Sequence, residues 1–137
     1  MTRLRMASHA AGAIAAHARA SAPEECCGLL VGTGDRVERA VPTRNLRASR
    51  DRYLVDPAEH FAARRAARAE GLAVVGAYHS HPDGPLRPSA VDLAEAFETG
   101  FVYVIAGPGP AGPPGGLAAF RFTGTGFEAL DLDVEAK

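Results

Sequence analysis

The residues best suited to chemistry are two histidines that flank a single serine, followed further along by an aspartate. The stretch AYHSHPDGPLRPSAVD contains them as His79, His81 and Asp92. Residues i and i+2 of a strand point to the same side, so a strand ending here presents both imidazoles in one direction. Two neutral imidazoles and a carboxylate leave one position of a tetrahedral zinc site open, as in catalytic zinc sites. The sequence therefore predicts a zinc site formed by these three residues.

Simpler interpretations of the same residues remain open. SAVD, from Ser89 to Asp92, is also the pattern of an N-terminal capping box, which needs no metal. Two histidines near the end of a strand can be polar edge residues. Together these alternatives are weaker, because the helix that carries Asp92 begins just after the turn that follows His81. Its carboxylate can return to the same place.

Hydrolysis at a zinc site also needs a general base for the attacking water and a donor for the developing oxyanion. Ser89 lies beside the helix of the third ligand and can donate a hydrogen bond. A glutamate that does not bind the metal could act as the base, and the candidates include Glu24, Glu25, Glu59, Glu70 and Glu95. Composition alone does not choose among them.

The elements that must position these residues alternate between helices and strands. Apolar periodicity and turn residues predict helices over 8–21, 56–71 and 89–100, and strands over 26–32, 36–43, 72–80, 101–107, 117–124 and 127–134. Ser8 is expected to cap the first helix, and Asp56 the second, with Glu59 completing a capping box. The order predicts an α/β fold with a single mixed, curved β-sheet flanked by helices. Residues 1–137 are expected to form one domain.

Composition excludes several classes of function. The chain has 137 residues, 47% of them hydrophobic, and a net charge of −1, which argues against a general nucleic-acid or membrane-surface binder. Lys137 is the only lysine, so the chain has no interior lysine for Schiff-base chemistry or for a phosphate-binding loop. Enzymes of these two classes are therefore not expected. No apolar run reaches the roughly 18 residues of a membrane span. The alanine-rich N-terminal stretch resembles a targeting peptide only weakly and is interpreted as part of the fold.

Two further features have a structural and a functional interpretation. Cys26 and Cys27 are adjacent and fit neither a zinc ribbon nor a thioredoxin motif, so we interpret them as reduced packing residues of a cytoplasmic protein. Six arginines lie between Arg36 and Arg52. They form either a solvated face or a surface that docks an acidic protein partner.

Two blocks of the sequence resemble the JAMM (MPN+) metallopeptidase family. HSHPDGPLRPSAVD matches the family's His-Ser-His-Pro motif with its later Ser-x-x-Asp, and PEECCGLLVG, residues 23–32, matches the upstream Pro-x-Glu block. The resemblance makes His79, His81 and Asp92 zinc ligands. It makes Glu25 the general base and Ser89 the oxyanion stabiliser. Glu24 would be one residue too early.

The resemblance also implies a fold and a substrate. The JAMM/MPN fold is similar to that of cytidine deaminases, and the family cleaves peptide or isopeptide bonds just after the C-terminal Gly-Gly of ubiquitin or ubiquitin-like proteins. This compact chain resembles prokaryotic members that process ubiquitin-like sulfur carriers. The alternative is a non-catalytic MPN-type interaction module, against which the intact site residues argue. Amidohydrolase barrels need about 250 residues, and zinc deaminases need His-x-Glu and Pro-Cys-x-x-Cys, which the sequence lacks.

Overall fold

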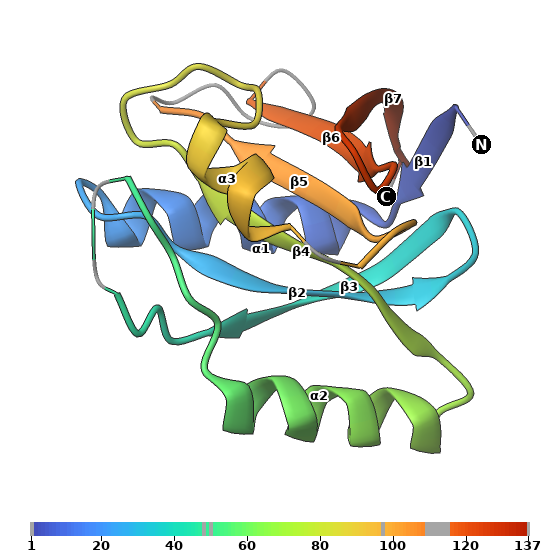
Figure 1. The fold of residues 1–137 in the computed structure, drawn as a ribbon. Coiled ribbons are helices and arrows are strands. Elements are labelled where there is room, and N and C mark those ends of the chain that lie inside the picture. The colour runs from blue at the N-terminus through green and yellow to red at the C-terminus, as the bar shows by residue number, and fades with distance from the viewer. Residues whose placement is uncertain (1, 48, 50, 97, 109–115, 137) are drawn as a thin grey trace.

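Within the part of the chain that the structure describes, seven strands form a closed barrel, with one long helix on each face of the curved sheet (Figure 1). The computed structural model describes residues 2–47, 49, 51–96, 98–108 and 116–136. In chain order the elements are β1 Arg3–Met6, α1 Ser8–Ser21, β2 Cys27–Thr33, β3 Arg36–Thr43, α2 Pro57–Ala69, β4 Ala73–Ser80, α3 Ala90–Glu95, β5 Val102–Ala106, β6 Leu117–Phe122 and β7 Phe127–Val134. That they make up a single domain over 1–137 stays a prediction.

The barrel mixes parallel and antiparallel pairs in the order β1-β3-β2-β4-β5-β6-β7. β1 pairs in parallel with β3 and β7, and β4 pairs in parallel with β5. The remaining neighbours are antiparallel, including the predicted pair β2–β3 and the late succession β5, β6 and β7. The long parallel neighbours β4 and β5 are buried along almost their whole length, as strands covered on both faces must be.

Alternation along β2 explains why helices cover both faces. Leu30 packs in a core with Ile14 of α1, whereas Leu29 and Val31 pack with Ala67 of α2. Successive strand residues point to opposite faces, so an apolar run such as this one supplies two cores. No helix within the described residues is both long enough and apolar enough to cross a bilayer.

The sequence analysis missed β1, which closes the barrel. Leu4 and Met6 are fully buried while Arg3 and Arg5 are exposed, so this short strand alternates as a half-buried strand should. Its four residues are too few to produce a clear periodic signal before the alanine-rich helix begins. The strand also fixes the residue that follows it, because the N–H of Ala7 donates to the carbonyl of Val37. Ala7, and not the predicted Ser8, is therefore the N-cap of α1.

Helix ends differ from the predictions in three places. α1 begins at Ser8, but the N-cap is Ala7, which the strand just before it fixes in an extended conformation. Asp56 caps α2 as predicted, through the N–H of Ala58, whereas Glu59 accepts a hydrogen bond from the N–H of Arg44 in place of completing a capping box. α3 ends at Glu95, well before the predicted end at residue 100.

The described arginines of the 36–52 cluster are largely paired within the chain. Their partners are Glu38 and Glu135 for Arg36, Glu70 for Arg39, Asp56 for Arg44 and Glu95 for Arg47. Residue 50 lies outside the described residues. These pairs favour the solvated-face interpretation of the cluster, while docking of an acidic partner stays a prediction.

Candidate active site

The three predicted ligands meet at the end of β4. The Nε2 atoms of His79 and His81 lie 3.1 Å apart, and they lie 3.2 Å and 3.1 Å from Oδ2 of Asp92. Tetrahedral zinc with bonds of about 2.0–2.1 Å requires ligand atoms about 3.3 Å apart, so this triangle has the required size. These residues are therefore placed to bind a metal.

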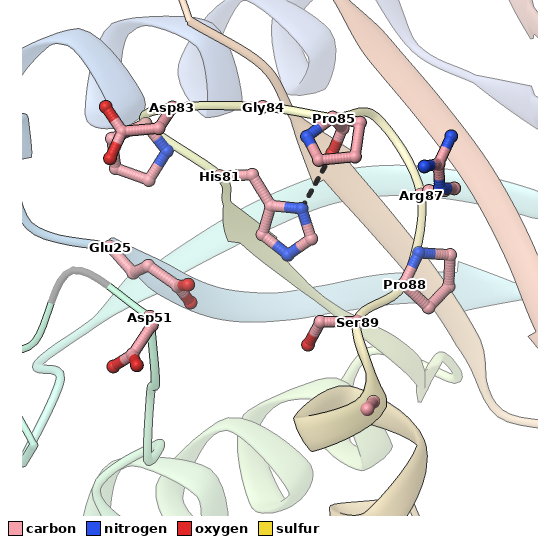
Figure 2. A pocket seen from close by; sticks show the side chains of 11 residues that line it. Glu25, Asp51, His81, Asp83, Gly84, Pro85, Arg87, Pro88 and Ser89 are labelled. Atoms are coloured by element: carbon pink, nitrogen blue, oxygen red, sulfur yellow. Dashed lines mark hydrogen bonds between the residues drawn. The ribbon is translucent and has the colours of Figure 1, made fainter.

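Both imidazoles are held with Nε2 toward the centre of the triangle. Nδ1 of His81 lies 2.8 Å from the carbonyl oxygen of Pro85, so its N–H donates there and leaves the Nε2 lone pair free (Figure 2). The ring of His79 stacks on Tyr53 with centroids 4.4 Å apart. Burial lowers the pKa of His79 and keeps it in the neutral form that binds metals.

Asp92 serves the helix cap and the metal triangle at once. Its Oδ2 accepts a hydrogen bond of 2.8 Å from the N–H of Ser89, and its own N–H donates to Oγ of Ser89 at 3.0 Å. The capping box is therefore present beside the ligand triangle, so the two interpretations of SAVD coexist. Burial acts to raise the pKa of Asp92, but hydrogen bonds with His79 and His81 outweigh it and hold the pKa well below its usual range.

Glu25 reaches into the pocket beside these ligands. This pocket of about 490 Å³ is lined by Glu25, His81 and Ser89, with prolines among its other residues (Figure 2). Glu25 is 4% exposed, whereas Glu24 lies on the surface. Oε1 of Glu25 has no hydrogen-bond partner among the described residues. Burial, opposed by the charge of His81, raises the pKa of Glu25 to about 8, and a buried carboxyl group with a pKa raised in this way is suited to accept a proton.

Ser80, which separates the two histidines, links the segment of Glu25 to the ligand strand. Its Oγ accepts a hydrogen bond of 2.8 Å from the N–H of Cys26, and its own N–H donates to the carbonyl of Cys26. The sequence analysis assigned roles to neither Ser80 nor Tyr53. The position of Ser80 between the two histidines was a sequence signal for a role in the site. Tyr53 lies in a separate connection, and nothing in the sequence pointed to its role.

A family model describing prokaryotic homologues of the JAB domain matches residues 7–123. The chain belongs to this family. A relative of this chain from Haloferax volcanii, named desampylase, is 38% identical over 98% of each chain. A Thermus thermophilus relative, named probable TtuB-protein conjugate cleaving protease, is 43% identical over 59% of this chain and 55% of its own.

Solved structures share the fold. A Desulfitobacterium hafniense protein superimposes with a TM-score of 0.84 at 31% identity, over 98% of this chain and 94% of its own. A structure described as JAMM, a metalloprotease-like zinc site in the proteasome and signalosome, shares the fold, with a TM-score of 0.64 at 21% identity over 98% of this chain and 100% of its own. The predicted JAMM resemblance and mixed α/β fold are confirmed, and the enzyme class, metallopeptidase, is confirmed at the level of the family.

Proposed function

We propose that this prokaryotic JAB protein is a zinc-dependent peptidase or isopeptidase that cleaves after the C-terminal Gly-Gly of a ubiquitin-like protein of the sulfur-carrier type. One observation carries the proposal: the carboxyl group of Glu25, whose Oε1 has no hydrogen-bond partner among the described residues, faces a pocket that is also lined by His81 of a ligand triangle of zinc dimensions. The name of the Thermus relative, a protein-conjugate cleaving protease, supports the substrate class.

The donor set fits zinc, because two imidazole nitrogens and one carboxylate oxygen are ligands of catalytic zinc sites. When bound, zinc supplies Lewis-acid chemistry that polarises a carbonyl and acidifies water. Glu25 takes the proton of the attacking water and later returns it to the leaving amine, and its high pKa of about 8 in the metal-free protein suits proton transfer near neutrality.

Ser89 stabilises the oxyanion in this proposal. Its Oγ accepts the N–H of Asp92, so the hydroxyl proton can be donated toward a substrate carbonyl oxygen. The pocket wall nearby includes Pro82, Pro85 and Pro88. Glycine has no side chain and can pass close to such a wall, which would account for the proposed selection of Gly-Gly without a side-chain pocket.

The test is incubation of the zinc-loaded protein with a ubiquitin-like carrier extended past Gly-Gly, followed by intact mass spectrometry. The expected product ends at the second glycine, and a carrier with Ala-Ala at these positions is the matched control. Binding of the carrier without cleavage would instead support the interaction module. The proposed location is the cytoplasm, which the free, buried Cys26 and Cys27 support.

A further inference from the structure

Asn45 is the only side-chain amide of this protein, since the chain has one asparagine and no glutamine. All of its hydrogen-bonding capacity is used. Nδ2 donates to the carbonyls of Glu25 at 3.0 Å and Arg52 at 3.2 Å, and Oδ1 accepts the N–H groups of Arg47 at 3.0 Å and Leu54 at 2.9 Å. Two carbonyls on one side and two N–H groups on the other fix the orientation of the amide.

These bonds fold the connection between β3 and α2 against the active site. Asn45 also forms an isolated antiparallel bridge with Val55, which closes the base of the connection. Between these residues the connection carries Tyr53, whose ring stacks on the ligand His79. It also carries Ser49, whose carbonyl accepts the N–H of Glu25 at 2.7 Å.

The backbone of Glu25 is therefore held on both sides by one connection. Its N–H donates to Ser49, and its carbonyl accepts from Asn45. Oε1 has no partner among the described residues, so nothing described there fixes that end of the side chain. The backbone of Glu25, and the amide that anchors it, set where the side chain starts and so help to aim the carboxylate.

We propose that Asn45 is a positioning residue for the general base. It keeps the Glu25 carboxylate aimed at the ligand triangle by fixing the Glu25 carbonyl and, through its other three bonds, the connection that receives the Glu25 N–H. The inference rests on the proposed function for the role of Glu25. Asn45 lies outside the residues that line the pocket and touches no reacting atom.

The principal test is a double-mutant cycle. Asn45→Ala should lower kcat about 10- to 100-fold, the scale expected when a reacting group is displaced by about 1 Å. Bound zinc should stay near its wild-type value, because all three ligands come from residues 79–92. KM should change less than kcat, because the connection between β3 and α2 supplies Asp51 alone among the described residues that line the pocket. In the Glu25→Gln background the same substitution should lower kcat by less than about threefold, because the base that Asn45 positions is already absent. An equal loss in both backgrounds would overturn the proposal.

A matched control removes a comparable loop contact elsewhere. Thr123 uses its hydroxyl to bond both the N–H and the carbonyl of Gly126 in the turn between β6 and β7. Thr123→Ala should loosen that turn and leave kcat unchanged. If Thr123→Ala lowered kcat as much as Asn45→Ala, loosening of any loop would be enough to lower turnover, and the proposal would be overturned.

A second variant separates the two sides of the amide. Asn45→Asp keeps acceptors for Arg47 and Leu54 but loses both donors, including the one to Glu25. It should lower kcat at least as much as the alanine variant, and full turnover would overturn the proposal.

Hydrogen exchange provides a readout that needs no substrate. In Asn45→Ala, the amide of Glu25 should exchange at least about tenfold faster by NMR, with or without zinc, while core amides of β4 remain protected. Unchanged exchange at Glu25 would also overturn the proposal. An inactive wild type with this exchange result would instead refute the proposed function alone.

Discussion

His79, His81 and Asp92 take their positions from a single short stretch, in which a strand end, a turn and a helix cap follow one another. Glu25 precedes β2 and takes its position from Ser80 and from the connection between β3 and α2. The ligand half of the site therefore follows from local backbone rules, and the base half follows from contacts between distant segments. Substitutions far from the chemistry should consequently disturb the base more readily than the ligands.

Removal of the metal tests the ligand half and has the largest expected effect. Chelation should abolish cleavage completely, because no other described group can replace the Lewis acid. Added zinc should restore cleavage at about one equivalent per chain, measured by elemental analysis beside turnover. Asp92→Asn should weaken zinc binding and lower activity with it. Full turnover in protein stripped of metal would contradict the assignment.

Replacement of the base should lower turnover about 10²- to 10⁴-fold while zinc stays bound. Glu25→Gln keeps the size of the side chain and leaves the three ligands untouched. Glu24→Gln is the control and should be nearly silent, because Glu24 is exposed. If Glu24→Gln is inactive and Glu25→Gln is active, the general base is Glu24 and has been assigned one residue too late in the chain.

Ser89 belongs to both halves, since it caps α3 and lines the pocket. Ser89→Ala should lower kcat about 10²- to 10³-fold through loss of the oxyanion donor. It should also cost about 1 kcal/mol of stability through loss of the cap. Turnover and thermal unfolding should be measured together. A stability loss without a loss of kcat would leave Ser89 with the capping role alone.

The raised pKa of Glu25, about 8, predicts a pH dependence in the metal-free protein. Folded Glu25 keeps its proton up to about pH 8, while the unfolded chain loses it near the ordinary value. The contribution of Glu25 to stability is therefore highest below the ordinary pKa and falls as pH rises through 8. Glu25→Gln should remove this fall and raise the melting temperature by several degrees at pH 8.5 but not at pH 4. Equal pH profiles of melting would contradict the burial of a protonated base.

The smallest effect is expected at Arg47, which pairs with Glu95 of α3 at 2.8 Å. Such exposed pairs contribute little, so Arg47→Ala should change KM and its salt dependence by less than about twofold. A clear loss of salt dependence would instead support docking of an acidic partner by the arginine cluster.

The sequence predicted the parts of the fold whose signals are local. The two cysteines, the glycine turn and the apolar run into His79 identified β2, β3 and β4. Asp92 could be placed because its helix starts immediately after the histidine motif. β1 could not, because a strand of four residues has meaning only when β3 and β7 lie beside it. Glu25 was identified by resemblance, since spacing alone left five acidic candidates.

The contacts that hold Glu25 lay beyond such reasoning. Asn45 looks like an ordinary turn residue in the sequence, and its importance comes from a carbonyl that tertiary structure brings to it. Likewise, the arginine cluster suggested a partner surface because its acidic partners, such as Glu70 and Glu135, are remote in the chain. Charges that are clustered in sequence can be neutralised in space.

The shortness of β1 has a consequence for how an extended peptide tail could be bound. Among the described residues, β1 pairs only with Arg36 and Val37 of β3, so the outer edge of β3 from residue 38 to 43 has no strand beside it. Edges of this kind are where many proteins capture extended peptides by strand addition. The pocket, in contrast, is bordered by the connection that carries Asp51 and by the turn from His81 to Ser89, so a tail bound there would lie across loops, which can diverge while the barrel stays the same.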